Sequence, residues 1–243
     1  MKRKELVKIF LRSLLIQASW NVPRLQGLGF AYATAPLAGN EVTGRPAVQA
    51  LLARHLQRFS THPYMAAPII GVVTRLELEN RSSETAELKN ALMGPYAALG
   101  DTFFWGALKP FSAAAALYLA VQGSLLAPVL FALLYSPAHL WVRVRGFLEG
   151  LRGGRDGIDF VGRLELPEKT KWCRWGTAVV LGGVAALVSS GGPMSAPIES
   201  GFAGHAAGLL VVLACFLAVK RGLSVFAVLY GAVALCAVAV WVQ

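Results

Sequence analysis

Four long stretches of this chain contain no charged side chain. They are 110–142, 175–198, 200–219 and 222–243, with lengths of 33, 24, 20 and 22 residues. A helix needs about 20 apolar residues to cross the hydrocarbon core of a bilayer. Hydrophobic residues make up 56% of the 243-residue chain and charged residues 15%. We therefore expect an all-α, polytopic integral membrane protein with about four regular transmembrane helices.

The charged residues give the chain a net charge of +10. They gather beside apolar runs, where basic side chains set topology and contact anionic lipid headgroups. No nucleic-acid motif accompanies them, so we expect membrane lipids and no nucleic acid as partners of this charge. The three cysteines and four histidines show no spacing typical of disulfides or metal ligands, so neither a cofactor nor a metal is expected.

Charge and hydropathy divide the chain into four regions. Residues 1–60 are expected to form amphipathic helices at the membrane interface. Residues 61–142 would hold hairpins broken by Gly and Pro and a first regular crossing at 112–135, as the core of a substrate path. Residues 143–174 carry eight Lys/Arg and five Asp/Glu and predict a basic cytoplasmic loop. Residues 175–243 would hold the C-terminal transmembrane helices.

The positive-inside rule also gives an orientation. With residues 143–174 in the cytoplasm, crossings at 175–190, 204–219 and 223–241, with an outer loop at 189–201, leave the C-terminus outside. The basic amphipathic segment at the start of the chain is typical of a helix at the cytoplasmic interface. We therefore expect a cytoplasmic N-terminus.

Two apolar segments of the second region are too short or too interrupted for regular crossings. Segment 61–74 contains Pro63 and Pro68, and Pro63 is expected to start a half-helix. Segment 92–110 contains Gly94, Pro95, Gly100, Gly106 and Pro110. A pair of such segments is typical of re-entrant hairpins at the substrate site of a transporter, because irregular backbone survives in a bilayer only where it lines a cavity or is packed in protein.

Five motifs follow one another along the first 135 residues. They are FLRSLLIQASWN (10–21), LQGLGF (25–30), RHLQRFSTHPYMAAPIIGV (54–72), LMGPYAALGDTFFWGALKP (92–110) and QGSLLAPVLFALLY (122–135). On these motifs the chain resembles the IID membrane subunit of the mannose/fructose/sorbose family of bacterial sugar phosphotransferase systems.

The resemblance implies a permease subunit of the bacterial inner membrane that is not itself an enzyme and carries no phosphorylated residue. Such a subunit pairs with a IIC membrane subunit in a hetero-oligomer, and together they translocate a hexose-like sugar. A cytoplasmic IIB subunit phosphorylates the sugar with phosphate from IIA. Phosphorylation makes the sugar an anion, which cannot return through an apolar membrane.

Asp101 is the first candidate for contact with the sugar. A carboxylate within a membrane segment is costly and is by default a functional-site hypothesis, and it can accept hydrogen bonds from two hydroxyls. Alternatively, Asp101 caps a half-helix over 102–108. Trp105 could stack on a sugar ring or pack against a neighbouring helix.

Ser60, Thr61 and His62 directly precede the expected half-helix at Pro63. Their hydroxyl and imidazole groups could bind sugar, or Ser60 or Thr61 could cap the helix. Structural or interface roles are expected for Gln17, Asn21, Gln26, Gly94, Gly100 and Lys109. The amides would bond other helices or subunits, and the glycines would allow close approach of backbones.

Two positions depart from the family pattern, which usually has Asn where Ser60 stands and Arg where Lys109 stands. Serine has one donor where an amide has two, and lysine lacks the bidentate fork of arginine. An alternative hypothesis follows: the chain could be a membrane docking or regulatory platform for phosphotransferase components that moves no sugar.

Overall fold

The computed structural model describes residues 2–39, 45–189 and 202–224, together with 226–228, 230, 231 and 234. This described part is built of helices joined by turns, so the all-α expectation is confirmed for it. The elements are α1 (Arg3–Ser13), α2 (Gly27–Thr34), η1 (Ala35–Gly39), α3 (Arg45–His55), α4 (Ala66–Leu78), α5 (Ser82–Gly100), η2 (Asp101–Leu108), α6 (Lys109–Val121), α7 (Ala127–Gly153), η3 (Gly154–Ile158), α8 (Asp159–Gly162), α9 (Leu166–Ser189) and α10 (Phe202–Lys220). η1 and η3 are 3₁₀-helices, and η2 is a π-helix.

The chain divides into two compact units, residues 1–184 and 185–243. The second unit contains α10, which covers the crossing expected at 204–219. The outer loop expected at 189–201 and the last crossing expected at 223–241 lie largely outside the described residues. All further description concerns the first unit.

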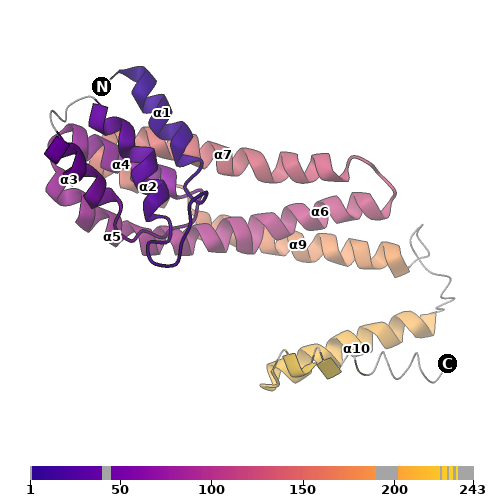
Figure 1. Ribbon diagram of the computed structural model, residues 1–243. Helices are drawn as coiled ribbons and strands as arrows, with labels where there is room; N and C mark the ends of the chain where they lie inside the picture. The colour runs from indigo at the N-terminus through magenta and orange to yellow at the C-terminus, as the bar shows by residue number, and fades with distance from the viewer. Residues whose placement is uncertain are drawn as a thin grey trace. The chain divides into compact units, whose positions relative to one another are not determined.

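One end of the first unit is a helical cluster, here called the head, formed by α1–α5 with residues 142–164 (Figure 1). Its centre is α4, where ten of thirteen residues are buried. α4 crosses α7 at very close range, because a Cβ added to Gly150 of α7 would lie 2.5 Å from the carbonyl oxygen of Pro68. Gly146 also lies against Pro68. This GxxxG spacing lets two helix backbones approach, as in helices packed within membranes.

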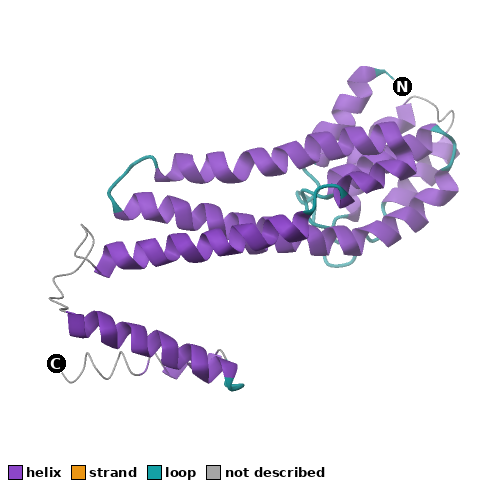
Figure 2. Cartoon of the chain, turned by 180° about the vertical axis from the view of Figure 1, so that it is seen from behind, coloured by secondary structure: helices purple, strands orange, loops and turns teal. Residues whose placement is uncertain are grey.

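The rest of the first unit, here called the arm, consists of η2, α6, the turn at 122–126, residues 127–141 of α7, and α9 as far as residue 184 (Figures 1 and 2). α6 and α7 form a hairpin whose turn contains Gly123 at φ +77°, a left-handed conformation that favours glycine. α9 lies along α6, since the Phe111 ring faces Gly176 and the Tyr118 ring faces Gly183. Large apolar side chains of the arm face outward, including Leu125, Leu133 and Val179, which are 93%, 65% and 72% exposed. Such a surface suits lipid or another membrane subunit.

The hairpin expected at 92–110 is not present. The segment is helical throughout, and α5, η2 and α6 form one helical run over 82–121. Pro95 lies inside α5. The Gly and Pro residues of this segment produce no turn, and the departure from α-helical geometry is the π-helical hydrogen bonding of η2. A proline within a membrane helix is tolerated because neighbouring groups can satisfy the backbone groups it leaves free.

Two other expected boundaries are wrong. The crossing expected at 112–135 is divided by the turn at Gly123 between α6 and α7. The loop expected at 143–174 is mostly helical, because α7 continues to Gly153 and α9 already begins at Leu166. Positive charge indicates which side of a membrane a segment occupies and carries no information on whether that segment is helical. The runs 82–121 and 127–188 are long and apolar enough to contain membrane crossings.

Candidate functional site

Aromatic and basic side chains meet where the head joins the arm. We call them the junction cluster, and they come from the loop before α4, from η2 and from α7: His62, Tyr64, Phe104, Trp105, Tyr135, His139 and Arg143. The ring of Tyr64 is central. It stacks on His139 with centroids 4.4 Å apart, and the Arg143 guanidinium lies 4.5 Å from its centroid. The hydroxyls of Tyr64 and Tyr135 are 3.1 Å apart.

His62 is 1% exposed and is held by its surroundings. Its ring stacks on Phe104 with centroids 5.2 Å apart and lies 4.6 Å from the Trp105 ring. The backbone N–H of Tyr64 donates to Nδ1 over 3.2 Å, while Nε2 is buried with no hydrogen-bond partner in the described part of the chain. Since a buried polar atom without a partner is costly, Nε2 is a group that a ligand or another subunit could satisfy.

Gly100 makes the position of His62 possible. A Cβ at Gly100 would lie 2.5 Å from Cγ of His62 and 2.9 Å from Cγ of Met65. Only a glycine therefore lets the last turn of α5 rest on the imidazole. This is the close approach expected for Gly100, whereas Gly94 faces open space with no heavy atom within 4 Å of an added Cβ.

Asp101 and Trp105 lie on the outer side of η2. Both are exposed, Trp105 by 46%, and they are four residues apart, about one turn. The start of η2 has no side-chain cap, and the helix runs through this point. The capping role considered for Asp101 is therefore wrong. The arrangement leaves a carboxylate and an aromatic face on the same side of η2, with the Trp105 ring 4.6 Å from that of His62.

The loop before α4 is fixed by Gln26. The Gln26 amide donates to the carbonyl of Thr61 over 2.7 Å and accepts from the N–H of Thr61 over 3.0 Å. Thr61 is buried, its Oγ1 has no partner among the described residues, and Ser60 is exposed. α4 begins only at Ala66 and has no side-chain cap, so the helix start expected at Pro63 and the cap by Ser60 or Thr61 are both wrong.

The remaining expected residues lie apart from the junction cluster or contact it little. Asn21 holds a local turn, accepting from the N–H of Arg24 and donating to the carbonyl of Ser19. Gln17 is exposed after α1, and Lys109 is exposed at the first position of α6.

Sequence reasoning missed Tyr64, Phe104, Tyr135, His139 and Arg143. A signal was present, because Tyr135, His139 and Arg143 are spaced by four residues and so follow one side of a helix. This four-residue spacing is not apparent when residue 143 is assigned to a loop. In the described residues no group of three or more His, Cys, Asp or Glu side chains is placed to bind a metal.

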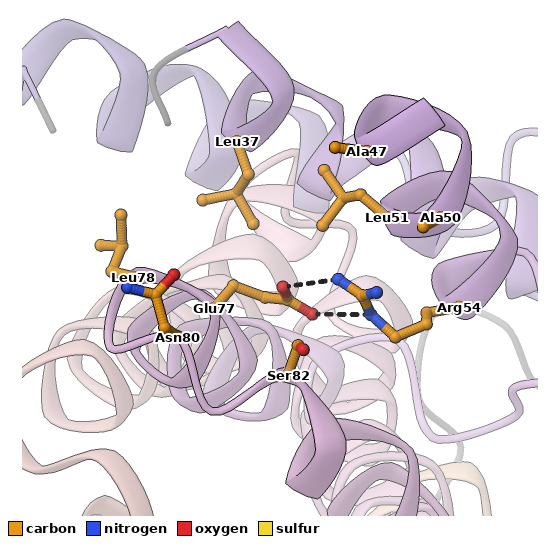
Figure 3. Close-up of a pocket in the computed structure, with 9 residues that line it drawn as sticks. All are labelled: Leu37, Ala47, Ala50, Leu51, Arg54, Glu77, Leu78, Asn80 and Ser82. Atoms are coloured by element: carbon orange, nitrogen blue, oxygen red, sulfur yellow. Dashed lines mark hydrogen bonds and ion pairs between the residues drawn. The ribbon is translucent and has the colours of Figure 1, made fainter. Parts of the chain in front are cut away.

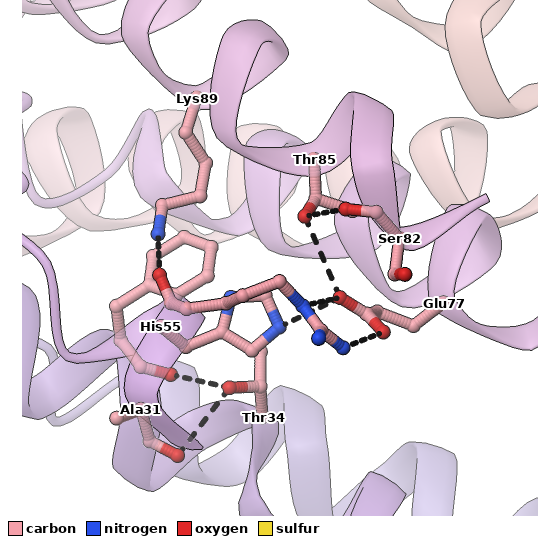
Figure 4. Close-up of polar contacts among 9 residues, drawn as sticks. Ala31, Thr34, His55, Glu77, Ser82, Thr85 and Lys89 are labelled. Atoms are coloured by element: carbon pink, nitrogen blue, oxygen red, sulfur yellow. Dashed lines mark hydrogen bonds and ion pairs between the residues drawn. The ribbon is translucent and has the colours of Figure 1, made fainter. Parts of the chain in front are cut away.

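A second polar group lies inside the head, around Glu77. Arg54 donates to both carboxylate oxygens of Glu77, from Nε over 3.3 Å and from an Nη over 2.9 Å (Figure 3). His55 Nε2 lies 3.1 Å from the same carboxylate. Buried Lys89 donates to the carbonyl of Arg54 over 3.0 Å and lies 4.7 Å from the Phe30 ring centroid (Figure 4).

This network joins α3, α4 and α5 beside a pocket of about 210 Å³. Burial lowers the pKa of His55. Burial by itself would raise the pKa of Glu77, but its close pairing with His55 and Arg54 outweighs burial and leaves that pKa lowered. The carboxylate is already paired by groups of the chain, so the network stabilises the head and leaves little charge for a ligand.

Comparison with known proteins identifies the family. The family described as the PTS system mannose/fructose/sorbose family IID component matches residues 1–243. The chain is similar to the mannose-specific EIID component of Escherichia coli K12, with 39% identity over 163 residues that cover 63% of this chain and 57% of the relative. It is similar to the Bacillus subtilis fructose permease IID component, with 34% identity over 63% of this chain and 58% of the relative. The chain thus spans less than two thirds of the length of these relatives.

Among solved structures, the fold is similar to a chain in the cryo-EM structure of the mannose transporter ManYZ with microcin E492. The TM-score is 0.61 at 27% identity, over 98% of this chain and 96% of that chain. A second structure, described as a membrane protein, gives a TM-score of 0.74 at 27% identity over the same shares. Because the family matches the full chain, this protein belongs to the IID components of the mannose/fructose/sorbose phosphotransferase family.

Proposed function

We propose that this chain is the IID subunit of a sugar permease that pairs with a IIC membrane subunit and translocates a hexose-like sugar, which a IIB subunit phosphorylates. The observation that carries the proposal is the similarity to a chain of a mannose transporter over nearly the full length of both chains. The exposed apolar surface of the arm supports the pairing, because outward-facing side chains such as Leu133 and Val179 suit a second membrane subunit.

The geometry favours one placement in the membrane. Residues 101–121 and 127–147 form two antiparallel helical stretches joined at Gly123. Each has 21 residues and a length of about 31 Å, against about 30 Å for the hydrocarbon core. Arg143 and Arg145 then lie at the cytoplasmic end of the second stretch, and the remaining basic residues of 143–174 lie with the head in the cytoplasm. The Gly123 turn lies outside, and α9 crosses outward again. In this placement the N-terminus is cytoplasmic. The two further crossings predicted from the sequence at 204–219 and 223–241 would leave the C-terminus outside.

This placement puts the junction cluster at the cytoplasmic end of the crossings, where a soluble IIB subunit can reach a sugar. There we assign Asp101 to accept hydrogen bonds from sugar hydroxyls and the exposed face of Trp105 to stack on the ring. Nε2 of His62 and Oγ1 of Thr61 would bond further hydroxyls, and Ser60 lies at the rim. A carboxylate at the membrane boundary is also less costly than one at mid-bilayer.

The test is uptake by membrane vesicles that contain this chain, its IIC partner, and the IIA and IIB components. We expect sugar phosphate to accumulate from external sugar, and Asp101→Asn to reduce uptake at low sugar by about tenfold or more, as for the loss of a hydrogen bond to a charged group. Asp156→Asn is the matched control, since Asp156 is an exposed carboxylate in η3, outside the junction cluster.

If vesicles with the unaltered chain accumulate no sugar phosphate from any of a broad panel of hexoses and amino sugars, the transport function is wrong. If Asp101→Asn behaves like Asp156→Asn while transport proceeds, only the assignment of the site is wrong.

The alternative function, a docking or regulatory platform, is motivated by Ser60 and Lys109, which are both exposed. For a platform, the double variant Ser60→Asn with Lys109→Arg should leave the signalling output of the system unchanged. A strong change in sugar-dependent signalling in that variant would contradict a pure docking role.

A further inference from the structure

A groove separate from the junction cluster lies between α1 and the second half of α7. Its volume is about 470 Å³, and its floor is apolar, with Val7 and Phe10 on α1 and Val144 and Leu148 on α7. One end is closed by an aromatic contact, because the rings of Phe10 and Phe147 have centroids 5.5 Å apart.

Two arginines line the same groove, Arg3 from α1 and Arg152 from α7. Arg3 is seven residues before Phe10, and Arg152 is five residues after Phe147, so both lie toward the end of the groove opposite the aromatic contact. Both are exposed, and neither guanidinium has an ion-pair or hydrogen-bond partner within the described ranges. The groove therefore has a basic end and an apolar end, about 10 Å apart along α1.

The groove also has a direction relative to the membrane segment of α7. Residues 127–142 of this helix carry no charge, and the apolar end of the groove at Val144 and Phe147 follows them directly. The basic end at Arg152 is two turns further from the uncharged stretch. An anionic head at the arginines and a chain running toward the bilayer would match this polarity.

We propose that this groove binds an anionic glycerophospholipid. The phosphate pairs with Arg3 and Arg152, since a guanidinium fork matches phosphate oxygens bidentately. One acyl chain lies along the floor over Val7 and Leu148. A free phosphate would gain nothing from that floor, and a peptide would leave its backbone groups without partners there. The bound lipid links α1 to α7 at the membrane surface. The N-terminal helix, which is expected at the interface, then contacts one specifically bound lipid.

The experiment is native mass spectrometry of the chain in complex with its IIC partner, titrated with dioleoyl phosphatidylglycerol. Dioleoyl phosphatidylcholine and glycerol 3-phosphate serve as comparison ligands. We expect a saturable phosphatidylglycerol site that neither comparison ligand occupies. The double variant Arg3→Gln with Arg152→Gln should weaken it about thirtyfold, from the usual contribution of two basic residues to binding an anionic lipid.

Two further variants separate the site from general electrostatic attraction. Arg24→Gln with Arg58→Gln removes two exposed arginines outside the groove and should leave binding unchanged. Val7→Trp fills the groove at a half-exposed position and should abolish binding while both arginines remain. The proposal is overturned by equal occupancy with phosphatidylcholine, by competition from glycerol 3-phosphate, or by retained binding in both groove variants. Binding to the isolated chain but not to the complex would show that the IIC partner covers the groove, and would also overturn it.

Discussion

The contact between Gly100 and His62 gives the sharpest prediction. Gly100→Ala places a methyl group against an imidazole that is 1% exposed. The imidazole cannot move away, because Phe104 stacks on one side and Tyr64 meets it edge-on with centroids 4.8 Å apart. The last turn of α5 must therefore separate from the loop before α4.

The magnitude follows from two opposing effects. Overpacking of a filled site costs about 1–3 kcal/mol. Replacing glycine by alanine within a helix contributes about 1 kcal/mol in the opposite direction. Gly182→Ala in α9 is the matched control, because no heavy atom lies within 4 Å of its added Cβ and the gain in helix propensity is the same. The difference between the two variants isolates the overpacking, and it should be about 1–3 kcal/mol in favour of Gly182→Ala.

The assay is thermal unfolding of the purified chain in detergent, where 1 kcal/mol corresponds to about 2–4 °C for a chain of this size. Gly182→Ala should melt at or above the temperature of the unaltered chain, and Gly100→Ala below it. On a His62→Ala background the penalty at Gly100 should decrease, as a double-mutant cycle between contacting residues requires; the contact with Cγ of Met65 remains. Equal melting temperatures for Gly100→Ala and Gly182→Ala would refute the reasoning.

Three further predictions concern the head. Glu77→Gln leaves partly exposed Arg54 without its charged partner and should cost about 1.5–3 kcal/mol, as for a hydrogen bond to a charged group, seen as a lower melting temperature. Glu79→Gln, at an exposed pair, should cost less than about 1 kcal/mol. The lowered pKa of His55 means that the unfolded chain takes up a proton below pH 6.5 that the folded chain resists, so stability is present above that pH and falls on acidification, by at most about 1.4 kcal/mol per pH unit. A pH series of melting curves should show this slope reduced in His55→Gln, and an unchanged slope would contradict the reasoning. Gln26→Leu leaves the backbone of Thr61 unpaired and should cost about 1–3 kcal/mol, again measured by melting, and a neutral result would mean that water replaces both bonds.

The helical class could be predicted from the sequence because charge-free stretches of about 20 residues have few other folds available. The lengths of those stretches do not show where a helix turns back. The 33-residue stretch 110–142 is a hairpin because Gly123 adopts a left-handed conformation. Glycine permits this conformation without requiring it. A glycine at position 123 is therefore equally compatible with a kink in a continuous helix.

The candidate site was predictable where the residues are local in sequence. His62, Trp105 and Asp101 lie in two motifs, and the structure brings the first two rings within 4.6 Å of each other. Arg143 comes from a third element, and its contact with Tyr64 depends on how α7 crosses α4. That crossing depends on the small residues Gly146 and Gly150, which the charge pattern assigns to a loop.

The π-helical segment η2 explains how one helix serves both the buried cluster and the exposed face. Over 101–110 the side chains alternate in pairs, two exposed and two buried, with a period of four: Asp101 and Thr102, Phe103 and Phe104, Trp105 and Gly106, Ala107 and Leu108, Lys109 and Pro110. In an α-helix of 3.6 residues per turn a period of four rotates around the axis, by about 40° per repeat. A π-helix, with its i→i+5 hydrogen bonds, turns less per residue, so the rotation over four residues there has the opposite sense and offsets that of the adjoining α-helical turns. Asp101, Trp105 and Lys109 therefore stay in line on one side while Phe104 remains against His62, so the winding of η2 itself keeps the carboxylate and the indole side by side.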